Sequence, residues 1–311
     1  MLYNEWLDLW LQKYVKITVK LKTYDYYTRL INTHIKPILG KYDLDNLSPA
    51  LLQDFVIYKL EHGNIVTGNT LANGSVINIT KLVKQSICMA YDLNITKINN
   101  SNKIKLPTNP RTKITAFEKY EQEILEKYCL NNKKSNYVGI ILCLYTGIRI
   151  GELLALTWDD VDFKNKFISI TKTAYEIKQN GKYTIYVDTP KTNNSNRVIP
   201  ISNTLIKILK SIQKSATSKF IICTKSNTMV GTRSYQKTFE RILNKLELPY
   251  KNFHSLRHTF ATRAIEFGMD IKTLSEILGH KNPAVTLQRY AHSMTAHKIE
   301  IMNKFGKMLS F

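Results

Sequence analysis

The stretch His254–Tyr290, which reads HSLRHTFATRAIEFGMDIKTLSEILGHKNPAVTLQRY, gives the strongest indication of how this chain folds. A helix that begins near His254 places Arg257 and His258 within one turn of it, because residues three and four apart share a face. Apolar residues continue at helical spacing as far as Gly268, where the helix is expected to end. The stretch therefore predicts a helix that holds a cluster of polar side chains against a core.

Two shorter helices are expected in the rest of this stretch. The first carries an apolar stripe and ends at Gly279, which leaves His280 exposed at its end. Pro283 suits the first turn of the second helix, which would end near Tyr290. The three helices would thus place several donors near one another.

A metal site is the first alternative for this stretch. His254 and His258 are four residues apart, but the sequence lacks the glutamate of an H-E-x-x-H motif and offers no evident third ligand. Taken alone, a histidine is more often a core residue, and a tyrosine among 18 is more often packing or surface. Only the combination of residues indicates a function.

Length and charge indicate the number of domains and the kind of partner. With 311 residues, two domains of unequal size are expected. Lys and Arg number 45 against 24 Asp and Glu, and the resulting charge of +21 is spread along the chain. Such a surface favours a polyanion such as nucleic acid, although a merely solvated basic surface is the alternative.

The four cysteines lie far apart and form no C-x-x-C pair, so neither a zinc ribbon nor a disulfide framework is indicated. Cys143 and Cys223 lie in apolar runs and are expected to be buried thiols, which fits a reducing cytoplasm. The N-terminus does not resemble a signal peptide, and no apolar run reaches the roughly 20 residues that span a bilayer.

Residues 1–96 predict helices only. Thr23 can cap a helix that Pro37 and Gly40 would end, and Ser48 followed by proline is a strong signal for the start of another. A basic flank of this bundle is expected to contact nucleic acid through Lys13, Lys16, Lys20, Lys22 and Arg29.

Residues 97–113 read KINNSNKIKLPTNPRTK, with two prolines, five basic residues and no carboxylate. This composition predicts an extended interdomain linker whose charge would favour a path along phosphates. The residues expected to contact them are Lys103, Lys105, Arg111 and Lys113.

Residues 114–311 predict a mixed α+β, mainly helical domain with a small antiparallel sheet. Alternating patterns indicate strands at Phe167–Thr171, Thr173–Ile177 and Tyr183–Asp188, with a hairpin turn at Asn180–Gly181 and a further short strand at Phe220–Cys223. Helices are expected at Thr204–Ile212 and Tyr235–Leu246.

Two basic residues in this domain, Arg149 and Lys191, are candidates for anion binding. Arg149 lies between two isoleucines, beside apolar runs, so it needs an anion or a carboxylate, and Glu152 is placed to hold it. Lys191 follows the third strand in a turn, where a lysine is normally a solvated charge.

Taken together, these motifs resemble the catalytic signature of the tyrosine recombinases, the lambda-integrase family. They are G-I-R-I-G-E-L, a turn lysine followed by R-V-I-P-I, H-x-L-R-H, L-G-H, and a tyrosine ten residues after that histidine. The chain is most similar to integrases of prophages and integrative conjugative elements. Its first hundred residues resemble the helical core-binding domain of that family.

The resemblance implies that Tyr290 attacks a DNA phosphodiester and forms a 3′-phosphotyrosine. Arg149 and Arg257 would clamp the non-bridging oxygens, where negative charge grows in the transition state. Lys191 would protonate the departing 5′-oxygen. Because the phosphotyrosine ester keeps the energy of the broken bond, no metal, nucleotide or other cofactor is implied.

Further roles follow from the same resemblance. His254 would accept the tyrosine proton or bind the phosphate, and His280 would add a hydrogen bond to the transition state. Glu152 would support the arginine and histidine cluster, whereas His258 is expected to serve packing or support.

The implied partners are double-stranded DNA at attachment or core sites and other copies of the chain. A homotetramer on DNA would be linked by an apolar C-terminal tail helix between Met294 and Phe311, unless this tail docks on its own domain. The resemblance leaves room for accessory directionality or host DNA-bending factors, and it implies a bacterial, nucleoid-associated cytoplasmic protein without a membrane partner.

Several alternatives remain open from sequence. This chain begins directly at the core-binding helices, as expected of a Xer-like chromosome or plasmid resolution recombinase. The alternative is an integrase whose N-terminal arm-binding domain is missing or was removed. A type IB topoisomerase shares the chemistry without strand exchange. A non-enzymatic DNA-binding protein would explain the charge but not the catalytic set.

Overall fold

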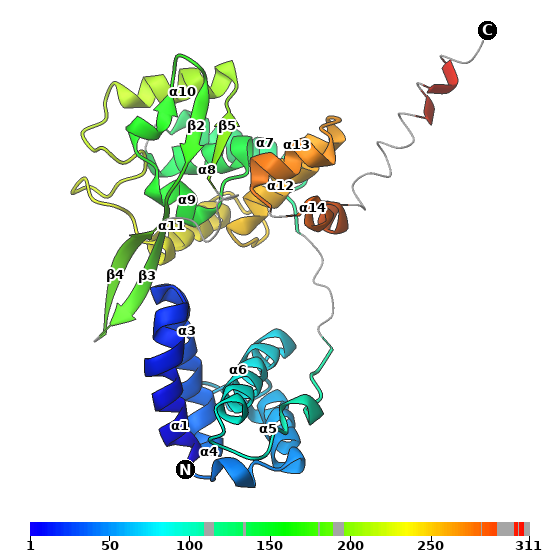
Figure 1. The fold of residues 1–311 in the computed structure, drawn as a ribbon. Helices are drawn as coiled ribbons and strands as arrows, with labels where there is room; N and C mark the ends of the chain where they lie inside the picture. The colour runs from blue at the N-terminus through cyan, green and yellow to red at the C-terminus, as the bar shows by residue number, and fades with distance from the viewer. Residues whose placement is uncertain are drawn as a thin grey trace. The chain divides into compact units, whose positions relative to one another are not determined.

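The chain forms two compact units, Met1–Thr112 and Lys113–Phe311 (Figure 1). The computed structural model describes residues 1–108, 115–132, 135–179, 181–188, 196–280, 282–290, 302–303 and 305–307. Across these residues, no helix combines the length and apolar character needed to cross a membrane.

The described residues of the first unit form helices joined by loops, with one isolated β-bridge between Leu2 and Asp43. Its main helices are α1 (Tyr3–Trp10), α2 (Lys16–Thr18), α3 (Leu21–Leu30), α4 (Lys36–Leu39), α5 (Pro49–His62) and α6 (Asn73–Asp92), with π-helical turns at Leu11–Val15 and Ile31–Ile35. The side chain of Ser48 caps α5 by accepting from the backbone N–H of Leu51, as its sequence predicts. Trp6 and other apolar side chains from these helices form one core.

Two details of this unit differ from the sequence-based expectations. The second helical stretch begins at Leu21, not at a Thr23 cap, and Pro37 lies inside α4 because proline is tolerated in a first helical turn. The expected linker also packs on this unit in its first part, since Ile104 is buried in the core and Asn100 donates to the carbonyl of Leu47.

The second unit is mainly helical, as expected, and its described strands form two small antiparallel sheets in place of the single one predicted. Its helices are α7 (Lys119–Asn131), α8 (Ser135–Thr146), α9 (Ile150–Ala155), α10 (Asn203–Gln213), α11 (Thr232–Lys245), α12 (His254–Glu266), α13 (Ile271–Leu278) and α14 (Pro283–Tyr290). Strands β1 (Val161–Asp162), β2 (Phe167–Ile170) and β5 (Arg197–Pro200) form one sheet in the order β1-β2-β5, and β3 (Thr173–Gln179) pairs with β4 (Lys182–Asp188).

One predicted strand is absent from the described residues of this unit. Phe220–Cys223 makes only isolated bridges, from Phe220 to Thr157 and from Cys223 to Met229. Because the two ends of this run pair with different segments, no continuous ladder forms. Cys223 is half-buried, whereas Cys143 is buried as expected.

The nearly fully buried helix α8 is central to this unit and leads directly to the site. The chain turns between α8 and α9 at Gly147, which has φ +65°, a conformation that favours glycine. A β-carbon there would collide with the ring of Phe260 on α12 and with Leu278 at the end of α13. The close packing of these segments places Arg149 beside both helices.

Candidate active site

The described site residues come from three places in the second unit: the turn between α8 and α9, the first turns of α12, and the segment from the end of α13 through α14 (Figure 1). Of the six residues expected to be catalytic, Lys191 lies outside the described residues. Arg149, Arg257 and His280 meet at the end of α13, and Tyr290 and His254 both contact His258.

Arg149 stands at the N-terminus of α9 and is tied to Glu152 one turn later. Its Nη1 donates to Oε1 of Glu152 at 2.7 Å, and its backbone N–H donates to Oε2 at 2.9 Å. Its Nη2 donates to the carbonyl of Gly279 at 3.1 Å. Because 37% of the Arg149 side chain remains exposed, the guanidinium can also meet a ligand from solvent.

Glu152 is buried, with 4% exposure, and is shared by two arginines. Arg197 donates from Nη1 to Oε1 at 3.0 Å and from Nη2 to Oε2 at 2.8 Å. Burial by itself would raise the pKa of this carboxyl, but the hydrogen bonds and charges of Arg197 and Arg149 outweigh it and lower the pKa to about 2. Glu152 is therefore ionised at neutral pH.

Arg257 lies in the first turn of α12 and is 2% exposed. Its Nη1 donates to the carbonyl of Gly147 at 2.8 Å and its Nη2 to the carbonyl of Leu278 at 2.7 Å. Burial, assisted by the charge of Arg149, lowers the pKa of the Arg257 guanidinium to about 9, which still leaves it cationic at neutral pH.

His280 contacts Arg257 directly, and this contact determines which of its ring nitrogens carries the proton. The Nε2 atom lies 3.0 Å from Nη2 of Arg257, and a guanidinium can only donate. Nε2 must therefore accept, so Nδ1 carries the proton and donates to Oγ1 of Thr286 at 2.7 Å. The histidine is thus half-buried between two partners, and the expectation that it would be exposed was wrong.

Tyr290 ends α14 and is buried, with 1% exposure, in a small cluster with apolar residues of α12 and α13. Its hydroxyl lies 2.7 Å from Nδ1 of His258. His258 in turn packs edge-on against the ring of His254, with 4.6 Å between ring centroids. His254 itself is exposed at the first residue of α12.

Three contacts in this site could not be identified from the sequence. His258 was expected to serve packing or support, but it bonds to the tyrosine hydroxyl, and no motif singles out Thr286. Arg197 stands in the sequence only as one letter of the R-V-I-P-I motif. An arginine that begins an otherwise apolar strand is the one signal that points to a buried partner for it.

The basic residues expected to contact DNA can be placed in part. Exposed side chains belong to Lys13, Lys16, Lys22, Arg29, Lys103 and Lys105, whereas Lys20 is half-buried. Arg111 and Lys113 lie outside the described residues. Within the described ranges, histidines, cysteines and carboxylates form no group of three that could hold a metal ion.

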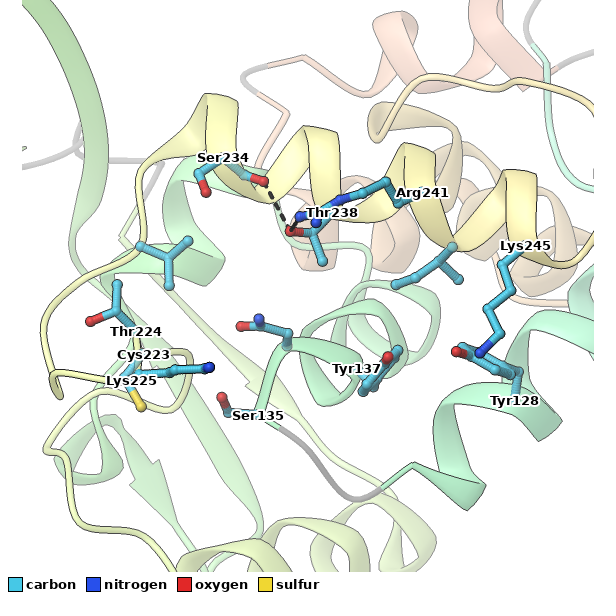
Figure 2. A pocket seen from close by; sticks show the side chains of 13 residues that line it. Tyr128, Ser135, Tyr137, Cys223, Thr224, Lys225, Ser234, Thr238, Arg241 and Lys245 are labelled. Carbon is cyan, nitrogen blue, oxygen red and sulfur yellow. Dashed lines mark hydrogen bonds between the residues drawn. The ribbon is translucent and has the colours of Figure 1, made fainter.

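A cavity of about 800 Å³ lies between α7, α8 and α11 (Figure 2). Lys225, Arg241 and Lys245 line it, together with tyrosine, serine and threonine side chains. None of the five described residues expected to be catalytic takes part in its lining, and Arg241 uses its guanidinium to bond within α11. This cavity is therefore separate from the cluster around Arg149 and Arg257.

Comparison with known proteins identifies the family. Residues 115–297 match the phage integrase family, and residues 2–60 match the N-terminal SAM-like domain of phage integrases. A XerC-like tyrosine recombinase of Caldanaerobacter subterraneus is 33% identical over 226 residues, a match that covers 65% of this chain and 58% of that protein. The ICEBs1 integrase of Bacillus subtilis is 28% identical over 296 residues, which cover 90% of this chain and 76% of that protein.

Solved structures show the same fold. The Tn1549 transposon integrase in complex with a circular intermediate DNA superposes with a TM-score of 0.82 at 22% identity, covering 98% of this chain and 99% of that chain. A lambda integrase dimer bound to a core site superposes with a TM-score of 0.70 at 16% identity, covering 93% of this chain and 77% of that chain. Since the family match alone covers more than half of the chain, the chain belongs to the phage integrase family of tyrosine recombinases.

Proposed function

We propose that this chain is a site-specific DNA recombinase, an integrase that cuts and rejoins DNA through a 3′-phosphotyrosine formed by Tyr290. The observation that carries this proposal is the convergence of Arg149 and Arg257 on adjacent carbonyls of one helix end, with His280 in contact with Arg257 and Tyr290 on the following helix. The arrangement gathers two guanidinium groups at one helix end, of which Arg149 keeps an exposed side.

The arginines would stabilise the charge that develops during cleavage. A pentacoordinate phosphorus places extra negative charge on its non-bridging oxygens, and a planar guanidinium can donate to two of them at once. Arg257 is held rigidly by carbonyls, whereas Arg149 keeps an exposed side. A lysine ammonium, whose three N–H donors radiate from one nitrogen, could not reproduce this planar arrangement.

Proton transfers would fall to the remaining residues. Lys191 would protonate the departing 5′-oxygen, which is a poor leaving group as an alkoxide. His254 would accept the tyrosine proton or bind the phosphate. His280, protonated on Nδ1, presents Nε2 to Arg257 and would exchange this contact for the phosphate only after a tautomer change or protonation.

Cleavage also requires Tyr290 to change its surroundings. With 1% exposure and its hydroxyl bonded to His258, the tyrosine cannot meet a phosphodiester in the described arrangement. We infer that α14 shifts when DNA is bound, so that the hydroxyl leaves His258 and reaches the scissile phosphate. Such a shift would keep the nucleophile protected until a substrate is in place.

Double-stranded DNA at attachment or core sites is the proposed substrate. The relatives solved with DNA support it, as does the +21 charge. The exposed basic residues of the first unit would track phosphates, and the stretch from Lys103 would continue this contact. Residues 1–96 would then serve as the core-binding domain, residues 97–113 as the connection, and residues 114–311 as the catalytic domain.

We further propose that the active assembly is a homotetramer. A lambda integrase has been solved as a tetramer bound to a Holliday junction, at 16% identity to this chain. In the tail, Met302 and Phe305 are exposed, with 65% and 47% exposure, which suits docking on a neighbouring copy. The rest of this tail lies mostly outside the described residues.

A mobile element is the proposed setting. Relatives include the transposase of transposon Tn916 of Enterococcus faecalis, 26% identical over 88% of this chain and 70% of that protein, as well as the ICEBs1 integrase. The XerC-like relative keeps chromosome or plasmid resolution as a second candidate. A type IB topoisomerase is less well supported, because the matches cover both units.

Two plasmid assays test the proposal. DNA on both sides of the gene is sequenced to find repeated sites, and a supercoiled plasmid that carries two of them is incubated with the full chain. We expect deletion or inversion between the sites without metal or ATP. Relaxation of the plasmid without any exchange product would instead indicate a topoisomerase, and an unchanged plasmid would indicate a non-enzymatic DNA-binding protein.

A further inference from the structure

The C-terminal end of α13 satisfies its backbone carbonyls in an unusual way. A helix end leaves its last four carbonyls without partners inside the helix. Here the carbonyls of Ser275 and Glu276 accept from the backbone N–H groups of His280 and Gly279, each at 3.0 Å. The next three carbonyls, of residues 277, 278 and 279, each accept from a different arginine.

These three arginines come from distant segments. Arg197 at the start of β5 donates from Nε to Ile277 at 2.6 Å. Arg257 of α12 and Arg149 of α9 donate to the carbonyls that follow. The negative end of the α13 dipole favours all three cations. Arg257 and Arg149 are the proposed phosphate clamp, which leaves the purpose of Arg197 to be explained.

All three guanidinium nitrogens of Arg197 are bonded, two of them to one carboxylate, so this side chain has no edge left for a phosphate. Its side chain is 6% exposed, and its guanidinium bonds on one edge to both oxygens of Glu152 and through Nε to Ile277. A guanidinium can satisfy these directions together, whereas a lysine ammonium cannot. Arg197 thus connects the base of α9 to the end of α13.

The neighbouring glycine shows how closely this connection is packed. Gly279 has φ +65° and ψ 47°, so it needs the left-handed conformation. A β-carbon there would also lie 3.1 to 3.2 Å from Cδ, Nη1 and Nε of Arg197. The glycine of the L-G-H motif therefore makes room for Arg197 as well as ending the helix, and His280 follows directly.

We propose that Arg197 is a positioning residue for the phosphate clamp. By holding Glu152 against α13, it fixes the direction in which Arg149 offers its exposed side and the place where His280 begins. It also sets the net charge around Glu152. A pair of Glu152 and Arg149 would be neutral, whereas Glu152 between Arg149 and Arg197 leaves the three residues with a net positive charge. The proposal rests on the proposed recombinase function and adds a residue to it.

The test compares Arg197→Met with Arg263→Met in the full chain. Arg263 is a matched control, because it also bonds to a carboxylate, Glu266, and to a backbone carbonyl, that of Phe117, but it takes no part in the described site contacts. Covalent adduct formation is measured on a nicked duplex that carries the recombination site, along with duplex affinity and thermal stability. We expect Arg197→Met to lower the adduct rate on the order of 10- to 100-fold with nearly unchanged affinity, and Arg263→Met to leave the rate within about twofold.

Two altered substrates separate positioning from a purely structural role. With a methylphosphonate at the scissile position, one charged oxygen is gone, so the rate ratio between the unaltered chain and Arg197→Met should shrink. With a 5′-bridging sulfur, which leaves without a proton, the ratio should stay the same. If the rate ratio falls to near one with the sulfur substrate, the proposal is overturned. Arg197, which lies six residues after Lys191 in the sequence, would then act through protonation of the leaving group.

Further outcomes are equally decisive. If Arg197→Met unfolds, Arg197→Lys, which keeps the charge, takes its place, and its adduct rate should fall below that of the unaltered chain. A normal rate in either folded variant, or the same loss in Arg263→Met, overturns the positioning role. If the unaltered chain forms no adduct at all, the proposed function fails first, so the two failures can be told apart.

Discussion

Glu152→Gln perturbs the centre of the arginine cluster with little change in size. Glutamine keeps one acceptor oxygen but removes the buried charge that Arg149 and Arg197 share. The two arginines and hydrogen bonds lower the pKa of Glu152 from the ordinary 4.5 to about 2 in the folded chain. At about 1.36 kcal/mol for each tenfold change in proton affinity, the ionised carboxylate contributes roughly 3 kcal/mol to the free energy of unfolding.

The downward shift of the Glu152 pKa determines how the stability of the chain changes with pH. Because the folded pKa is depressed, the contribution is fully present above about pH 4.5 and is lost as the pH falls towards about 2. The unaltered chain should therefore exceed Glu152→Gln in stability by roughly 3 kcal/mol at pH 7. The difference should be constant down to about pH 5 and then narrow.

Urea unfolding followed by circular dichroism at pH 7, 5, 4 and 3 measures this difference. Glu266→Gln is the matched control, because Glu266 pairs with Arg263 at 2.8 Å but is 33% exposed, and such a pair contributes below about 1 kcal/mol. The reasoning is refuted if both variants lose equal stability at pH 7, or if the difference for Glu152→Gln is the same at pH 3 as at pH 7.

Three further predictions concern the proposed reaction. Lys191→Ala should cleave an ordinary substrate poorly but a 5′-bridging sulfur substrate nearly normally, and equal impairment on both would exclude the general-acid role. Duplex affinity, measured by fluorescence anisotropy, should fall on the order of 10³- to 10⁵-fold between 50 and 200 mM salt if six to ten phosphates are contacted, and a flat response would contradict phosphate tracking. In a double-mutant cycle of unfolding free energies, His258→Leu and Tyr290→Phe should show a coupling of about 1 kcal/mol from their 2.7 Å hydrogen bond, whereas additive effects would mean that the bond does not form.

Much of the fold follows from local patterns. Gly268 and Gly279 both take positive φ at helix ends, as their positions after apolar stripes predict, and α12 begins at His254. Local patterns failed where the deciding contacts are distant. The polar composition of residues 97–108 suggested an extended chain, but a single isoleucine, Ile104, finds a place in the helical core.

The candidate active site, like the fold, could be predicted only in part from the sequence. The resemblance to the tyrosine recombinases pointed to Arg149, Arg257, His280 and Tyr290, and their catalytic roles stay predictions. The supporting contacts could not be predicted, since Arg197 meets Glu152 across 45 residues and Ile277 across 80. No spacing rule applies to such pairs, because their encounter depends on the packing of β5, α9 and α13.

The central claim is that Tyr290 carries the cut DNA strand. A nicked duplex that carries the recombination site is incubated with the full chain, the covalent product is digested, and the peptide linked to the DNA is identified by mass spectrometry. The account predicts a 3′-phosphate ester on the Tyr290 peptide, formed without metal or ATP, and no adduct with Tyr290→Phe. An adduct that persists in Tyr290→Phe, or a linkage on a different residue, would contradict it.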